Sequence, residues 1–291
     1  MPSLRELKKH KRSVAVTEQL AGAMRTVSAA KLSQVSAALE AYRPYADSCA
    51  AMLSRFGGAV AEAMPCIAPE APVCYVIFSS NRGLCGGYNI TLLEYATSVL
   101  ESEERPYRLV VCGKAAASYL AERDLTGCTD CDTSHILSDV PTADSCFELC
   151  DLLCDMYRSG EVSAVYLVYQ SFVNMLTQEP TVRRLLPLTV EGDVTSEDGT
   201  ERDVLFVPDR ETVIAGFCTC LVNATFYSTA LEAASGAQAA TLMAMRSAYD
   251  NAREVSASLE TEIGRKRQSE VTAGVLETAS DKNSMRGTAE E

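Results

Sequence analysis

Residues 5–42 read RELKKHKRSVAVTEQLAGAMRTVSAAKLSQVSAALEAY, and this stretch decides the fold. It consists largely of Ala, Leu, Lys, Glu, Gln, Met and Arg, which are good helix formers. Ser3 and Glu6 are spaced as a capping box at its start, and no proline occurs between Ser3 and Arg43. At 1.5 Å per residue the helix would be about 60 Å long. Such a helix is too long for a compact domain, so it needs a partner along its length.

The residues that would face this partner recur at heptad spacing. They are Leu4, Leu7, Lys11, Val14, Glu18, Ala21, Leu32, Val35 and Leu39. Polar residues interrupt the seam and many neighbours are Ala or Ser, which favours close packing of small residues over a leucine zipper.

The end of the chain offers the partner helix. All ten prolines lie between positions 2 and 208, and proline costs roughly 3 kcal/mol inside a helix. With Asp209 as its cap, a second helix reaching Ser280 would be about 108 Å long. Four glycines in it, each costing about 1 kcal/mol against Ala, allow local bends: Gly216, Gly236, Gly264 and Gly274.

Between the two helices the periodicity changes, after the prolines at 65, 69 and 72. Short apolar runs predict buried strands at Val73–Ser79, Arg108–Cys112 and Val162–Tyr169, with a further candidate at Thr181–Val190. Helical patterns alternate with them at Tyr88–Glu104, Lys114–Arg123 and Thr142–Ser159. We therefore expect an α/β fold with a long antiparallel coiled coil, in which a small Rossmann-like parallel α/β domain is inserted between paired terminal helices. The predicted segments are a first coiled-coil helix (1–62), an α/β domain (70–207), a second coiled-coil helix (208–280) and a polar tail (281–291).

Composition narrows the classes of function. The 291 residues include 26 Lys and Arg against 39 Asp and Glu, a net charge of −13, which argues against direct binding to nucleic acid or anionic lipid. We expect no membrane-spanning segment, since such a helix needs an apolar run of about 20 residues, and no secretory signal is evident. The 12 cysteines are then best interpreted as reduced thiols. The segment Glu191–Glu211, rich in acids, is expected to be a solvated loop.

The segment SSNRGLCGGYN, residues 79–89, follows one predicted strand and precedes a helix. Its glycines Gly83, Gly86 and Gly87 could admit a phosphate at the helix N-terminus. The spacing is neither that of a Walker A loop nor GxGxxG. We therefore interpret the segment as a tight turn that needs positive φ angles.

Cysteine and histidine patterns offer weak catalytic or metal signals. Cys128, Cys131 and His135 have partial zinc-ligand spacing, and Cys146 would have to complete the set; a redox pair or a surface loop are the alternatives. Cys146, Cys150 and Cys154 share one helical face and are expected in the core, whereas Cys218 and Cys220 should face apart. His10 lies in a basic cluster and no catalytic triad is supported. We predict no catalytic, cofactor-binding or metal-binding residue.

Two basic clusters stand out on this acidic chain, Arg5–Arg12 and Arg265–Arg267. An antiparallel pair of helices would bring them to one region. They are either solvated helix faces or a charged collar that contacts acidic partner loops.

Four segments in order resemble the gamma subunit of F-type ATP synthases, over nearly the whole chain. They are SLRELKKHKRSV with AMRTVSAAKL, then SNRGLCGGYN, then SFVNMLTQEPTVRRLLPL, and finally AMRSAYDNA with RKRQSEVT. The resemblance implies the rotor of the central stalk, which couples ion flow through the c-ring to ATP synthesis or hydrolysis at the alpha and beta subunits, with epsilon beside it. It implies a peripheral membrane protein on the cytoplasmic face of the bacterial membrane, with no cofactor and no lipid insertion.

Residue by residue, the resemblance implies two sets of contacts. The residues implied to contact the surrounding ring of alpha and beta subunits are Met24, Arg25, Arg246, Arg267, Gln268 and Thr272. The foot motif is Arg82, Gly83, Leu84, Cys85, Gly86, Gly87 and Asn89.

The sequence also departs from the family pattern. Asn81 replaces a common Asp, Tyr249 a small Thr, and Ala273-Gly274 a Gln-Glu pair; Val207 stands where some members have an acid, and the end from Asp281 to Glu291 is polar. A divergent gamma paralogue with weakened coupling is therefore one alternative. The others are a coiled-coil adaptor and a small-molecule-binding protein that uses the glycine-rich turn.

Overall fold

The computed structural model describes residues 3–122, 127–135, 137–188 and 205–287. Its contacts divide the chain into two compact units: a helical unit, residues 1–26 with 245–291, and an α/β unit, residues 27–244. The end of the predicted polar tail and most of the predicted acidic loop lie outside the described residues.

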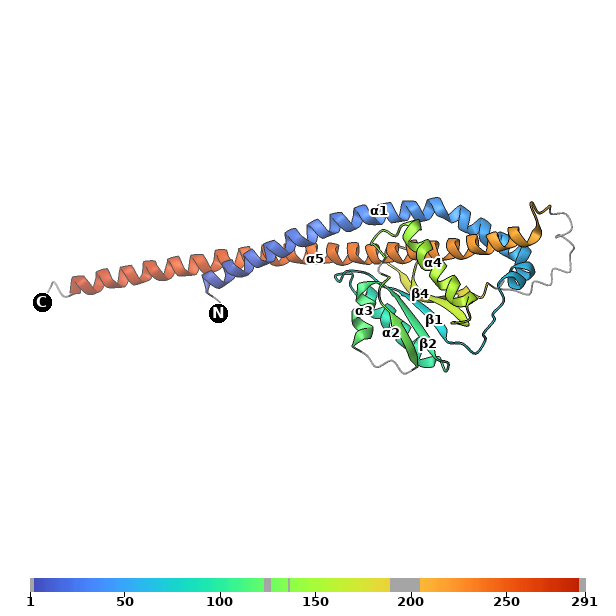
Figure 1. The fold of residues 1–291 in the computed structure, drawn as a ribbon. Coiled ribbons are helices and arrows are strands. Elements are labelled where there is room, and N and C mark those ends of the chain that lie inside the picture. Colours follow the sequence, from blue (N-terminus) through green and yellow to red (C-terminus); the bar gives the residue numbers. More distant parts are fainter. Residues whose placement is uncertain (1–2, 123–126, 136, 189–204, 288–291) are drawn as a thin grey trace. The chain divides into compact units, whose positions relative to one another are not determined.

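Two long helices contribute to both units (Figure 1). Helix α1 spans Leu4–Ala63 and α5 spans Arg210–Gly287, so α5 continues beyond Ser280. The capping box is confirmed, because the Ser3 amide donates to Glu6 Oε2 (2.7 Å) and the Glu6 amide to Ser3 Oγ (3.3 Å). Asp209 caps α5 by accepting from the Thr212 amide at 2.8 Å. Non-helical angles at Phe56 (φ −115°, ψ 16°) mark a kink within α1.

The α/β unit holds one five-stranded sheet. Its strands, in chain order, are β1 Val73–Phe78, β2 Tyr107–Cys112, β3 Cys128–Asp132, β4 Ala164–Phe172 and β5 Gln178–Leu186. They lie in the order β3-β2-β1-β4-β5. The first four strands run parallel, and β5 pairs antiparallel with β4. The sheet is therefore mixed, because a short turn after β4 makes a hairpin where the parallel prediction needed a crossover.

Helices cover both faces of the sheet. The connecting helices are α2 Tyr88–Ser102, α3 Lys114–Ala121 and α4 Ala143–Arg158. One core joins the sheet to α2 and α3, and the other joins it to α4 and to the α/β-unit parts of α1 and α5. Burial on both faces explains why β1 is apolar throughout, with all six residues buried.

Strand β3 was missed by the sequence prediction, which interpreted its cysteines as part of a loop. Its residues, CTDCD, are mostly polar and exposed because β3 is an edge strand. A register shift against β2 between Tyr107 and Arg108 marks a bulge. A short polar edge strand carries no hydrophobic alternation to detect.

The expectation that no segment is apolar enough to span a membrane was also wrong. Within the described residues, α5 has an 18-residue window of mean hydropathy 1.4. By length and composition alone this helix passes the test for a membrane span, with 44% of the window buried within the protein. Several apolar residues of α5 belong to the core against the sheet, namely Cys218, Leu221, Val222, Phe226 and Ala230.

Candidate partner-binding surfaces

Heptad seams run along both long helices. On α1 the predicted seam is confirmed, since each of its residues is buried or half-buried. The same spacing continues through Arg25 and Ser28, which the sequence interpretation left out. On α5 the matching positions are Met245, Tyr249, Ala252, Ser256, Leu259, Ile263 and Lys266, again buried or half-buried.

Charge pairs fix the direction of the two helices. Lys11 Nζ lies 3.0 Å from Glu260 Oε1, and Arg253 Nε lies 4.0 Å from Glu18 Oε1. As the α1 number rises from 11 to 18, its partner's number falls from 260 to 253, so the helices are antiparallel. These pairs are partly exposed, so each contributes about 0–1 kcal/mol and serves alignment more than stability.

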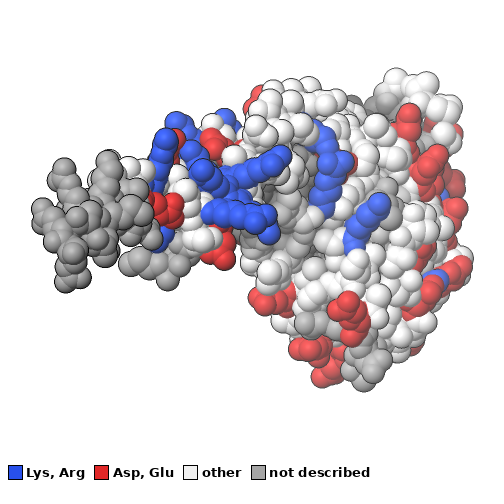
Figure 2. All heavy atoms as spheres, turned by 90° about the vertical axis from the view of Figure 1, so that its left-hand side faces the viewer, with Lys and Arg blue, Asp and Glu red and all other residues white. Residues whose placement is uncertain are grey.

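The antiparallel pairing brings the two basic clusters together, and Figure 2 shows Lys and Arg side chains gathered on these helices. We call residues Arg5, Lys8, Lys9, Arg12, Arg265 and Arg267 the basic collar; all six are exposed. The helical unit has 13 basic and 11 acidic residues, whereas the α/β unit has 13 basic and 28 acidic residues. The charge is therefore unevenly divided between the units, and the positive part suits an acidic partner surface.

The residues predicted to contact the ring of alpha and beta subunits divide into a half-buried and an exposed group. Met24 and Arg25 are half-buried, and the Arg25 guanidinium lies 4.6 Å from the centroid of the Tyr249 ring. The other four, Arg246, Arg267, Gln268 and Thr272, are exposed on α5. The Thr272 hydroxyl donates to the Gln268 carbonyl of its own helix at 2.9 Å.

The part of α5 after Arg267 has an exposed surface that is partly apolar. Residues 268–276 are all exposed, including Val271 (60%), Val275 (61%) and Leu276 (65%). Apolar side chains so placed on a continuous helix are typical of a surface that another protein covers.

The foot motif forms the turn between β1 and α2, as predicted. Of its three glycines only Gly86 has a positive φ (+60°), and the other positive φ of the turn (+66°) belongs to Leu84. Asn89 closes the turn by accepting from the Ser80 amide (3.2 Å) and donating to Ser80 Oγ (2.7 Å). Cys85 is buried, whereas Leu84 is 55% exposed. The turn therefore presents Leu84 outward from a closed hydrogen-bonded loop.

This turn lies where the strand order reverses, the place where open α/β sheets usually bind ligands. Here α5 occupies that place. The buried Tyr88 hydroxyl donates to the Ala233 carbonyl of α5 at 2.9 Å, and Gln170 Nε2 donates to the Tyr88 carbonyl at 2.5 Å. A Cβ on Gly236 would lie 3.2 Å from the Tyr88 ring. The motif thus joins the sheet to α5, which disfavours the small-molecule alternative.

Tyr88 and Gln170 were not among the predicted site residues. Gly236 carried a usable signal, because a glycine within a helix often marks a close approach of another element. The sequence interpretation took it as a possible bend.

Asn81, the departure from the family pattern, donates to two acceptors. Its Nδ2 lies 2.6 Å from the Leu137 carbonyl and 3.4 Å from Asp139 Oδ1, while its Oδ1 accepts from the Lys114 amide at 3.3 Å. Asp139 also binds Lys31 Nζ at 2.5 Å. An Asp at position 81 could not donate, and it would place a second carboxylate beside Asp139.

We expect Asn81→Asp to destabilise the chain by about 1–3 kcal/mol, because a donor is lost and two carboxylates are brought together. Urea unfolding at neutral pH measures the change. Asn174→Asp is the matched control, since the Asn174 Oδ1 only accepts, from the amides of Leu176 and Thr177, and an Asp keeps both bonds. Equal stability of the two variants would contradict this account of Asn81.

The Lys31–Asp139 pair predicts a pH-dependent contribution to stability. Burial by itself would raise the pKa of Asp139, but the bond and charge of Lys31, with Asn81 and Arg82, lower it below its usual 3.8. The pair therefore stabilises the fold above about pH 3.8, and this contribution is lost as pH falls through the lower folded-state pKa. Lys31→Met should cost about 1–2 kcal/mol at neutral pH. When unfolding is measured across pH, the difference in free energy of unfolding between this variant and the wild type should shrink in acid. A difference that does not change with pH would refute the contribution of the Lys31–Asp139 pair.

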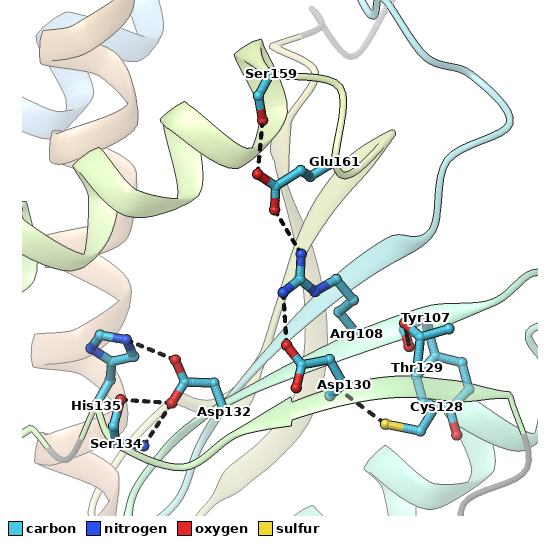
Figure 3. A network of polar contacts seen from close by, with 10 residues as sticks. All are labelled: Tyr107, Arg108, Cys128, Thr129, Asp130, Asp132, Ser134, His135, Ser159 and Glu161. Atoms are coloured by element: carbon cyan, nitrogen blue, oxygen red, sulfur yellow. Dashed lines mark hydrogen bonds and ion pairs between the residues drawn. The ribbon is translucent and has the colours of Figure 1, made fainter.

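Of the predicted zinc or redox residues, Cys128 and His135 are engaged in other contacts (Figure 3). Arg108 of β2 pairs with Asp130 of β3 (2.7 Å) and with Glu161 in the connection between α4 and β4 (2.9 Å). His135 pairs with Asp132 at 3.1 Å, and the Cys128 thiol donates to the Asp130 carbonyl at 3.3 Å.

No cluster of three or more metal-binding side chains occurs among the described residues. Partial desolvation raises the pKa of the Cys128 thiol and, together with the neighbouring Cys128, Asp130 and Asp132, that of the exposed Cys131 thiol, which lowers the thiolate fraction that redox exchange needs. Cys146, Cys150 and Cys154 are buried in the core as predicted, and Cys218 is buried while Cys220 is exposed. Cys146 therefore belongs to the core and not to a site with Cys128.

Comparison with known proteins gives a consistent result. The family model described as ATP synthase matches residues 3–284. The ATP synthase gamma chain of Desulforamulus reducens is 34% identical over 281 residues, covering 95% of this chain and 97% of that relative. The gamma chain of Desulforudis audaxviator is 31% identical with the same coverage.

Solved structures share the fold. A chain from the OSCP/F1/c-ring structure of the Euglena gracilis mitochondrial ATP synthase, in rotational state 3, has a TM-score of 0.64 and 15% identity, covering 99% of this chain and 96% of that one. A chain from the rotor of the same synthase, in rotational state 1, has a TM-score of 0.61 and 14% identity, covering 92% and 98%.

Proposed function

The chain belongs to the ATP synthase gamma-chain family and is the central-stalk rotor subunit of an F-type ATP synthase, and we propose that it transmits torque through the surfaces described above. The adaptor and the divergent paralogue are not favoured by the similarity to gamma chains over 95% of the sequence. The subunit is part of a membrane-associated complex.

The antiparallel pair of helices carries the proposal. Its basic collar suits acidic loops of the surrounding alpha and beta subunits, and the exposed apolar residues Val271, Val275 and Leu276 suit an enclosing apolar surface. We assign ring contacts to Met24, Arg25, Arg246, Arg267, Gln268 and Thr272. An asymmetric shaft in such a ring contacts each catalytic subunit differently, and differential contacts are what shift nucleotide affinities between conformations.

The α/β unit would serve as the foot of the rotor. We propose that it contacts the epsilon subunit and the c-ring on the cytoplasmic face of a bacterial membrane. The connection from the foot motif through Tyr88 to α5 supports this role, because torque applied to the sheet would reach the long helix through packed contacts. The chain itself would supply no catalytic residue and no cofactor site.

Reconstitution tests the proposal. Adding the chain to its cognate alpha and beta subunits should raise their ATPase activity, because the shaft imposes the conformational differences among the catalytic sites. Replacing four residues of the collar, Arg5, Lys8, Lys9 and Arg12, by Ala should weaken this activation most at low salt. The matched control removes four exposed arginines of the α/β unit, Arg43, Arg55, Arg158 and Arg183. Absence of activation by the wild-type chain would overturn the proposed role.

A further inference from the structure

Tyr249 occupies a seam position of the helical unit at a place where the opposite helix has almost no side chain. A Cβ on Gly22 would lie 3.3 Å from Tyr249 Cε2 and 3.4 Å from Cδ2. Such a contact is tighter than ordinary van der Waals packing, so a ring of this size depends on the glycine. The two residues are therefore complementary in size, a knob from α5 set against a gap in α1.

The same ring attracts cations from both helices. The Arg25 guanidinium of α1 lies 4.6 Å from the ring centroid, and the Arg253 guanidinium of α5 lies 5.9 Å from it. Both distances are within the range of about 6 Å at which a cation is attracted to an aromatic face. Arg253 also approaches Glu18 of α1 at 4.0 Å, so its charge is partly balanced.

Arg25 itself lies at a seam position, four residues after Ala21 and three before Ser28. The guanidinium of an arginine there is charged and cannot join an apolar seam, and the long side chain has many rotamers to lose when it is ordered. The Tyr249 ring gives the guanidinium a fixed neighbour within the seam. A polar residue held in this way at a seam position also specifies the alignment of two helices.

We propose that Tyr249 is a positioning residue, which holds Arg25 in the orientation that presents it to the surrounding alpha and beta subunits and fixes the alignment of α1 with α5 at this level. The inference rests on the proposed function, since it requires that Arg25 contacts the alpha and beta subunits. It predicts that the effect of Tyr249 on partner binding passes through Arg25.

A double-mutant cycle tests this in the reconstituted complex of alpha, beta and full-length chain. Affinity and ATPase activation are measured for the wild type, Arg25→Ala, Tyr249→Leu and the double variant. We expect each single change to weaken the affinity about two- to fivefold, as for loss of an exposed cation–π contact. The double variant should be no weaker than Arg25→Ala alone. Tyr249→Phe keeps the aromatic ring and should therefore retain the affinity that Tyr249→Leu loses. Tyr95→Leu, at a half-buried tyrosine of α2, is the control and should leave the affinity unchanged.

Additive losses, or a Tyr249→Leu variant with wild-type affinity, would overturn the inference. A wild-type chain that binds and activates the alpha and beta subunits, together with an unaffected Arg25→Ala variant, would overturn it while leaving the rotor role intact. Failure of the wild-type chain to activate would instead overturn the proposed function.

A second readout does not depend on partners. The chain contains no tryptophan, so Tyr249→Trp places a single tryptophan at this position, whose fluorescence can be excited separately from that of the tyrosines. If Arg25 covers one face of the ring, adding Arg25→Ala should make the tryptophan more accessible to acrylamide quenching. Unchanged quenching would show that Arg25 does not rest on the ring and would overturn the inference, even if Tyr249→Leu failed to fold.

Discussion

Gly113→Ala is expected to destabilise the chain by about 3–5 kcal/mol, because the added methyl group would collide with backbone atoms of Ser79, directly after the buried strand β1. Gly113 connects β2 to α3 with φ +155°. An added Cβ would lie 2.2 Å from the Ser79 carbonyl oxygen and 2.5 Å from Ser79 Oγ. The Ser79 hydroxyl accepts from the Ala116 amide at 2.9 Å, so the backbone that follows β1 and the start of α3 would both have to shift.

Denaturant unfolding followed by circular dichroism measures this loss. Gly216→Ala is the matched control, because Gly216 lies within α5 of the same unit and an added Cβ there would meet nothing within 4 Å. Alanine in place of a helical glycine should stabilise by up to about 1 kcal/mol. Similar effects of the two substitutions would contradict the close approach of Gly113 to Ser79.

Tyr88→Ala is expected to cost about 3–5 kcal/mol, as for other buried aromatic side chains. Tyr88 is 5% exposed, and its ring and hydroxyl together join the foot motif to α5. Burial raises the pKa of its phenol, so the hydroxyl remains a donor at physiological pH. Without the Tyr88 side chain the sheet should pack less tightly against α5, and torque should be transmitted less efficiently from the sheet to the long helix.

Tyr88→Phe separates the two contributions of this residue. It keeps the ring against Gly236 and removes only the bond to the Ala233 carbonyl, so we expect a loss of about 1 kcal/mol. Unfolding in urea gives both values, and the coupling of ATP hydrolysis to ion transport gives the functional consequence. If Tyr88→Ala were no worse than Tyr88→Phe, the ring would not be what holds the foot motif to α5.

Features with strong periodicity could be predicted from the sequence. The α1 seam, the caps at Ser3 and Asp209 and the apolar strands β1, β2 and β4 follow from local patterns and are confirmed. Each depends on residues close together in the chain, where spacing and propensity decide the structure.

Features that depend on distant contacts could not be predicted. Strand β3 is polar and is held by Arg108 bridging Asp130 and Glu161, a set drawn from three separate segments. Tyr88 meets Ala233 across 145 positions, and Arg25 meets Tyr249 only because the antiparallel pairing sets them together. Local spacing contains no information about such pairs. The resemblance to gamma chains supplied the function but did not identify these residues.

Single-molecule rotation tests the central claim most directly, namely that this chain is the rotating shaft. With the exposed Cys66 and Cys220 replaced by Ser, a probe can be attached to exposed Cys131, since the remaining cysteines are buried or half-buried. The alpha and beta subunits are immobilised and ATP is supplied. We predict stepwise rotation of the probe in one direction that stops when ATP is removed. ATP hydrolysis activated by the chain while the probe stays still would contradict the account.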